Sequence, residues 1–288
     1  MERPDEERVV PTSKSTLRQS NRENDRPAES RTRLVLLGAF AVEHDGSRLD
    51  LPPSAQRVLA FVALHPHPLQ RAYVAGSLWP DSSEERAHAC LRSALWRLGR
   101  DGHRLVTGPP PLLQRGKDVE VDLREAERQA RAALDGGSDG DLVTALARGG
   151  DLLPDWYDDW VLLERERYRQ LRLRALDGLC ERLARAGRLT EAFDAGLASV
   201  TSDPLRESAH RALVRMHLAE GNVGEAVRQY QLCRRLLNEQ LGLEPSPLMD
   251  ELVAHLERSD LRLAAYRRSR RPEPRPAVPR LSRAVARR

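Results

Sequence analysis

The stretch DSSEERAHACLRSALWRLGR (Asp81–Arg100) decides how the first half of the chain is interpreted. Ser82 stands three residues before Glu85, the spacing of a capping box, and Glu84 and Glu85 place negative charge at the positive end of a helix dipole. At 100° per residue, apolar side chains gather on one side of the helix. The stretch therefore predicts an amphipathic helix whose buried face consists of Ala87, Leu91, Ala94, Leu95 and Leu98.

The opposite face of this predicted helix carries arginines and no acid beyond the first turn. A helix of this kind, preceded by a shorter helix, can enter the major groove of DNA and place guanidinium groups on phosphates and guanine edges. The alternative is an ordinary amphipathic helix with solvated arginines, because charged outer faces are common. The candidate DNA-contacting positions are Arg86, Ala89, Arg92, Ser93, Trp96 and Arg97.

The residues before the helix predict a small sheet and two shorter helices. RLVLLGAF (33–40) is an apolar run of strand length, and Asp45-Gly46 between short runs at 41–44 and 47–51 indicates a β-hairpin. Helical spacing predicts a helix over 55–64, which ends before His65-Pro66, and a second over 71–79, which ends at Pro80.

The residues after the helix predict a hairpin. Short apolar runs at 105–107, 112–114 and 119–121 are separated by Pro109-Pro110-Pro111 and Gly116-Lys117. A sheet, three helices and a closing hairpin are the order of a winged helix-turn-helix. In that fold the hairpin is the wing, and Arg104, Arg115 and Lys117 are expected to meet DNA phosphates there.

This order of elements resembles the OmpR-type winged helix of the Streptomyces antibiotic regulatory proteins, the SARP family. The resemblance implies a four-stranded sheet before the helices, a third helix that reads the major groove, and regulation of secondary metabolism. It also implies that the loop Pro80–Glu85 faces RNA polymerase, through Asp81, Glu84 and Glu85. The stretches that carry it are DGSRLDLPPSAQRVLAFVALH, LWPDSSEERA, ACLRSALWRL and LVTG.

From Asp122 onward the sequence is almost entirely helical in pattern, with an internal repeat. Gly187 and Gly221 are 34 residues apart, and so are Glu191-Ala192 and Glu225-Ala226. A period of 34 residues is typical of tetratricopeptide helix pairs, in which glycine allows the turn and alanine lets the helices approach closely. Two matched units are fewer than a stable stack needs, so helices from 122 to 186 are expected to complete a concave array.

This half resembles the bacterial transcriptional activator domain (BTAD) that follows the winged helix in SARP-type regulators. The matching stretches are GDLLPDWYDDW, ERERYRQLRLRAL, DPLRESAHRALVRMHLAEGN, EAVRQYQLCRRLL and LGLEPSP. The chain has no G-x-x-x-x-G-K-[ST] phosphate loop, so it resembles the small, two-domain type. The expected fold is mainly α with a small antiparallel β part. The expected boundaries are a disordered segment at 1–32, the winged helix at 33–121, the helical domain at 122–258 and a disordered Pro- and Arg-rich tail at 259–288.

Charge is distributed unevenly along the 288 residues. The net charge is −1 for residues 1–30, +4 for 31–118, −8 for 119–257 and +9 for 258–288. This asymmetry indicates that one part faces a polyanion while another faces protein or solvent. The tail either adds salt-sensitive affinity for DNA or has no binding role. The absence of a long apolar run and of a leader predicts a cytoplasmic protein without membrane contact.

The sequence shows no catalytic constellation, so the chain is not expected to be an enzyme or to bind a cofactor. Cys90, Cys180 and Cys233 are too far apart for a disulfide framework or zinc site, and no histidine has a partner at ligand spacing. Asp155, Asp158 and Asp159 mark a helix start. Trp156 and Trp160 beside them either anchor helices together or form a ligand-binding box.

These features of the sequence are compatible with two functions. The first is a sequence-specific transcription activator that binds double-stranded promoter DNA at tandem direct repeats and recruits RNA polymerase holoenzyme, with the sigma factor as the expected contact. In this function the helical domain either provides homodimer contacts or recruits the polymerase. The second is a protein-interaction scaffold in which the helical array binds a partner and the winged helix does not bind DNA. The salt dependence of DNA binding separates the two, because phosphate contacts release counterions.

Overall fold

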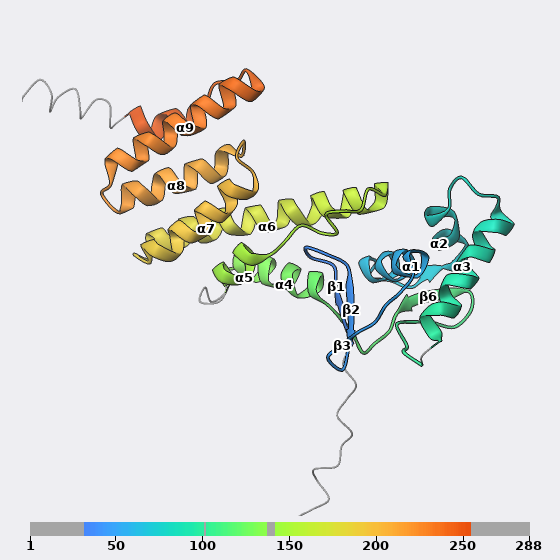
Figure 1. The fold of residues 1–288 in the computed structure, drawn as a ribbon. Helices are drawn as coiled ribbons and strands as arrows, with labels where there is room; N and C mark the ends of the chain where they lie inside the picture. Colours follow the sequence, from blue (N-terminus) through green and yellow to red (C-terminus); the bar gives the residue numbers. More distant parts are fainter. Residues whose placement is uncertain (1–31, 101, 137–141, 255–288) are drawn as a thin grey trace, which may run out of the picture. The chain divides into compact units, whose positions relative to one another are not determined.

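The computed structural model describes residues 32–100, 102–136 and 142–254. The segments expected to be disordered, 1–32 apart from Thr32 and 259–288, lie outside these ranges. The chain forms two compact units (Figure 1). The first contains the described residues up to Glu125 together with Asp151–Glu164, and the second contains Ala126–Gly150 and the described residues from Arg165 onward.

The first unit contains a mixed sheet, three helices and a second small sheet. Its elements are β1 (Thr32–Val35), β2 (Ala41–His44), β3 (Ser47–Arg48), α1 (Pro53–Leu64), β4 (Leu69–Gln70), α2 (Arg71–Leu78), α3 (Glu84–Gly99), β5 (Val106–Thr107), β6 (Leu112–Arg115), β7 (Val119–Val121) and the first turns of α4 (Asp122–Leu134) and α6 (Asp159–Arg185).

The N-terminal sheet has the strand order β3-β2-β1-β7. The expected hairpin is present: Asp45 and Gly46 both have positive φ, 48° and 79°, which matches the twist that a two-residue turn requires. The expectation that four strands precede the helices is wrong in one respect. The fourth strand is β7, which follows the helices and pairs with β1 in parallel, so the sheet is mixed rather than antiparallel.

The sheet at the wing is formed by strands from both sides of α2 and α3. Its order is β4-β6-β5, and β5 pairs with β6 in the expected hairpin, with Val106 opposite Arg115. The sequence predicts residues 119–121 as part of this hairpin, but they form β7 and pair with β1 instead. Gly116 allows the close approach that closes the hairpin, because a Cβ there would lie 1.9 Å from the carbonyl oxygen of Arg104.

The core of the first unit is built on α1, whose residues from Val58 to Leu64 are all buried. α1 packs against α2, α3 and β6. The Arg124 guanidinium donates to the carbonyl oxygens of Ala63 and Leu64, which have no helical partner at the end of α1. The three helices are therefore held in one block with the wing sheet.

The first unit extends past the expected boundary at residue 121. The backbone N–H groups of Leu36 and Leu37 donate to the two Asp122 carboxylate oxygens, at 2.9 and 3.0 Å. The segment Asp151–Glu164 also belongs to this unit, since the Leu153 N–H donates to the Leu36 carbonyl oxygen at 2.8 Å. The helical pattern of the sequence after Asp122 does not indicate that Asp151–Glu164 belongs to the first unit.

The second unit is a helical array (Figure 1). α7 packs against α5 and α8, and α8 packs against α9. Its elements are the remainder of α4 and α6, α5 (Leu142–Arg148), α7 (Leu189–Ser202), α8 (Glu207–Ala219), α9 (Val223–Leu241) and a helical segment at 247–254.

The predicted 34-residue repeat is confirmed by the backbone. Gly187 and Gly221, in the turns before α7 and α9, have φ of +76° and +79°, a region that glycine adopts without a steric penalty. Ala192 and Ala226 are completely buried. The repeat therefore marks two helix pairs, and residues of α4 and α5 complete the core around Leu176 and Leu179.

Polar groups inside the second unit are bonded across helices. Asp177 of α6 accepts hydrogen bonds from the hydroxyls of Ser199 and Ser208, both at 2.7 Å, and from Arg206 at 2.9 Å. The buried Arg172 side chain donates from Nε to the Leu146 carbonyl oxygen at 2.7 Å. Such bonds fix the helices in one register, because a buried polar group left without a partner is costly.

His210 of α8 is completely buried, and this burial predicts an acid-sensitive second unit. Nε2 lies 2.9 Å from the Pro204 carbonyl oxygen and Nδ1 lies 2.8 Å from the Gln229 side-chain nitrogen, so the neutral ring donates at Nε2 and accepts at Nδ1. Burial holds the pKa of His210 below its ordinary value of 6.5. Above pH 6.5 the His210 ring is neutral in both the folded and the unfolded chain. Below pH 6.5 the ring takes up a proton more readily in the unfolded chain than in the folded chain.

We therefore expect the free energy of unfolding of the second unit to fall as the pH drops below 6.5. His210→Gln should be less stable at every pH, but should lose less further stability on acidification. Urea unfolding at about pH 7.5 and about pH 5.5 measures this difference, with the exposed His67→Gln as control. An unchanged pH dependence in His210→Gln would assign the acid sensitivity to other groups.

Candidate nucleic-acid interface

The helix α3 begins at Glu84, and its N-cap is Ser83 rather than the predicted Ser82. The Ser83 Oγ accepts a hydrogen bond from the Arg86 backbone N–H at 3.4 Å. The capping-box assignment is therefore wrong by one residue, because the position three residues after the true cap is an arginine. Glu84 and Glu85 do lie in the first turn, where their charge stabilises the helix.

The buried face of α3 agrees with the helical periodicity of the sequence. Ala87, Leu91, Ala94 and Leu98 are at most 4% exposed, whereas Leu95 is half-buried. This face packs against α1 and α2, so rotation of α3 about its axis is fixed by the core. The remaining face is therefore presented outward by packing.

All six candidate DNA-contacting positions of α3 are exposed. Within the described part of the chain, the guanidinium groups of Arg86, Arg92 and Arg97 form no ion pair with an acid. Trp96 is 65% exposed, and Arg100 lies over its ring at 5.8 Å. Trp96 therefore packs against Arg100 on the outer face of α3. The outer face of α3 therefore presents arginine guanidinium groups together with the Trp96 ring. This combination suits DNA, which offers anionic phosphates and the apolar methyl groups of thymine.

The structure places the three wing residues differently from one another. Arg104 and Lys117 are exposed. The Arg115 guanidinium donates to the backbone carbonyl oxygens of Gly116 and Val119, and burial and the neighbouring Arg124 lower its pKa from its ordinary value. Arg115 is therefore used in holding the chain between β6 and β7. All three lie away from the hairpin turn 108–111, which contains no basic residue.

Arg71 is a residue near the wing that the sequence did not single out. Its backbone N–H donates to the Pro111 carbonyl oxygen at 2.9 Å, which ties the start of α2 to the hairpin turn. Its buried side-chain Nε has no hydrogen-bond partner among the described residues. In the sequence, Arg71 is marked only as a basic residue at the start of the helix that precedes α3. This pattern is too common to indicate a role near the wing.

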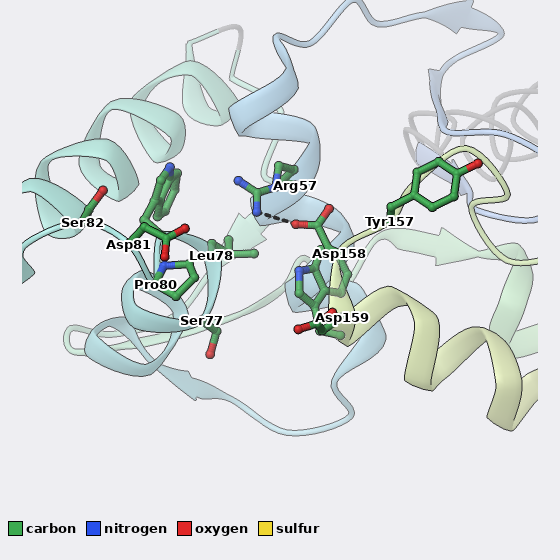
Figure 2. A pocket seen from close by; sticks show the side chains of 11 residues that line it. Arg57, Ser77, Leu78, Pro80, Asp81, Ser82, Tyr157, Asp158 and Asp159 are labelled. Carbon is green, nitrogen blue, oxygen red and sulfur yellow. Dashed lines mark hydrogen bonds and ion pairs between the residues drawn. The ribbon is translucent and has the colours of Figure 1, made fainter.

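The loop expected to face polymerase lines a pocket within the first unit. Asp81 is exposed, and the Glu84 carboxylate lies 3.9 Å from the His88 ring. Figure 2 shows Asp81 and Ser82 on one side of the pocket and the ion pair between Arg57 and Asp158 on the other. The pocket has a volume of about 450 Å³. Its lining residues are Arg57, Ser77–Ser82 and Tyr157–Trp160.

A second hollow lies in the helical unit between α5 and α7. It measures about 420 Å³, and Val143, Ala147 and Leu197 contribute apolar surface to it. Burial raises the pKa of the Cys180 and Cys233 thiols to about 12, so neither is a ready nucleophile or metal ligand. The described residues contain no group of three His, Cys, Asp or Glu side chains suited to a metal ion. None of the helices in the described ranges is both long and apolar enough to span a bilayer.

The fold and the exposed basic helix define a winged helix protein with a tetratricopeptide-like helical unit. Residues 119–257 match the family described as bacterial transcriptional activator domain. The regulatory protein AfsR of Streptomyces coelicolor is 28% identical to this chain over 245 residues, which cover 81% of this chain and 25% of AfsR.

A solved structure of Mycobacterium tuberculosis EmbR, in complex with a low affinity phosphopeptide, superposes with a TM-score of 0.61 at 21% identity. The match covers 80% of this chain and 66% of EmbR, and it supports the fold. In its domain order, a winged helix followed by a bacterial transcriptional activator domain, the chain is similar to SARP-type regulators. It spans a quarter of the length of AfsR.

Proposed function

We propose that this protein is a sequence-specific DNA-binding transcriptional regulator that activates promoters. The winged helix binds double-stranded promoter DNA, and the outer face of α3 enters the major groove. The observation that carries the proposal is a set of exposed arginines, which have no ion-pair partner in the described ranges, on a helix whose opposite face is fixed in the core. Guanidinium groups presented in this way match phosphate oxygens and the O6 and N7 acceptors of guanine.

Within this surface, side chains have different roles. Arg92 and Arg97 read bases by bidentate contact, and Trp96 offers an apolar face to thymine methyl groups. Arg104, Lys117 and Arg71 contact phosphates and position the helix without reading sequence. Arg115 instead stabilises the wing, because its guanidinium donates hydrogen bonds to backbone carbonyl oxygens.

A single winged helix offers few base contacts, so two copies on tandem direct repeats supply the specificity needed against genomic competitors. The helical unit provides the contact between the two copies. The exposed loop that carries Asp81, Glu84 and Glu85 contacts RNA polymerase holoenzyme, with the sigma factor as the expected surface. The SARP-type domain order, shared with AfsR, supports this assignment.

The proposal is tested by selecting bound duplexes from a random-sequence pool with the full chain. We expect a recovered motif that occurs as a direct repeat, and an affinity that falls with salt at a log-log slope of about −0.9 per phosphate contact. The measurement is fluorescence anisotropy of the selected duplex between about 50 and about 200 mM salt.

A scaffold that binds only protein predicts a different result. It would recover no motif, and any residual binding would be the same for selected and scrambled duplexes. Either outcome would exclude the proposed function, since sequence preference that survives at higher salt is what separates base reading from charge attraction.

A further inference from the structure

The pocket beside the loop after α2 has an excess of negative charge in its walls. Three carboxylates, Asp81, Asp158 and Asp159, line it with one guanidinium, Arg57. Arg57 is paired with Asp158 at 2.5 Å. Asp81 and Asp159 are exposed and have no cationic partner in the described ranges. The pocket is therefore suited to a cationic group, because two of its carboxylates remain unneutralised.

The same pocket has an aromatic lining. Trp79, Tyr157 and Trp160 contribute rings, and Tyr157 is 79% exposed. The buried indole Nε1 of Trp160 has no hydrogen-bond acceptor among the described residues. Grooves lined by aromatic residues bind proline-rich segments, whose polyproline II backbone leaves its carbonyl oxygens free to accept hydrogen bonds.

We propose that this pocket binds the Pro- and Arg-rich segment RRPEPRPAVPRL at residues 270–281 of the same chain. The segment lies outside the described residues, and its sequence contains four prolines and four arginines against one glutamate. It supplies a partner for both features of the pocket: guanidinium groups for the two carboxylates without a cationic partner among the described residues, and prolines for the aromatic rings.

The spacing within the segment suits this arrangement. A polyproline II helix has three residues per turn, so residues three apart share an edge. When bound in that conformation, Pro272, Arg275 and Val278 occupy one edge, with the cation between two apolar groups. Arg275 enters between Asp81 and Asp159, and the flanking residues contact the rings. The docking does not depend on DNA binding, although it would cover Asp81 of the proposed polymerase loop.

The test uses the full chain with Arg271→Ala, Arg275→Ala and Arg280→Ala, which weakens the chain's own segment and leaves the pocket open. A fluorescent peptide of residues 270–281 is titrated into this variant after nuclease treatment. We expect saturable binding, weaker binding to the parent chain because its own segment competes, and a loss of about tenfold on adding Asp81→Asn and Asp159→Asn.

The matched control adds Glu85→Gln and Glu120→Gln, which remove two exposed carboxylates of the same unit that lie outside the pocket. This control should leave the peptide affinity unchanged. A peptide with all four prolines replaced by alanine keeps its charge and should bind more weakly. Absence of binding, an equal loss in both carboxylate pairs, or equal binding of the alanine peptide would each overturn the proposal.

Discussion

Arg92→Ala combined with Arg97→Ala should abolish the selection of operator over scrambled DNA while the protein remains folded. Each good bidentate contact to a base contributes about 1–3 kcal/mol of discrimination, so loss of both should weaken binding to the selected duplex by about 100-fold or more. The two side chains are exposed and form no ion pair among the described residues, so their removal leaves no buried group without a partner.

The control for this variant removes the same charge elsewhere. Arg174 and Arg235 are exposed in the helical unit and have no partner within the described ranges. The pair Arg174→Ala and Arg235→Ala should keep the preference for the selected duplex. Anisotropy titrations of both double variants against selected and scrambled duplexes give the comparison. If the Arg92/Arg97 variant still prefers the selected duplex as strongly as the parent, these arginines do not read bases.

Much of the fold was predictable because its determinants are local. The buried face of α3 followed from a period of 3.6 residues, the β2-β3 turn from Asp45-Gly46, and the helix pairs from glycines 34 residues apart. The pairing of β7 with β1 was not predictable, since the two strands are separated by the three helices and no local signal connects them. The same holds for Asp122, whose role depends on amides of Leu36 and Leu37.

The candidate site was predictable to the extent that exposure follows from helical periodicity. Every candidate on α3 is exposed, and the sequence alone placed them on one face. The role of Arg115 was not predictable. The sequence does not distinguish an arginine whose guanidinium bonds backbone carbonyl oxygens from one whose guanidinium is exposed to solvent. The pocket was missed because its walls come from α1, the loop after α2 and the segment before α6.

Replacing Trp156 and Trp160 by alanine should destabilise the first unit strongly. The Trp156 ring stacks on Phe40 at 5.6 Å, and the Trp160 ring meets the buried Phe61 edge-on at 5.2 Å. A fully buried tryptophan costs about 3–5 kcal/mol to truncate, and both of these rings are half-buried, so we expect a loss of about 4 kcal/mol for the pair. Hydrogen exchange of α1 should accelerate by about three orders of magnitude, while α8 should exchange as before.

Trp96→Ala is the matched control, because it removes the same side chain from an exposed position. It should change stability by no more than about 0.5 kcal/mol and leave exchange in α1 unchanged, yet weaken binding to the selected duplex. If Trp156 and Trp160 formed only a ligand-binding box, their removal would also spare α1. Faster exchange in α1 would instead show that these rings, which lie beyond the wing in sequence, stabilise the helix against which α3 packs. The DNA-binding fold would then require Asp151–Glu164, and a fragment ending at Val121 would expose Phe40 and Phe61.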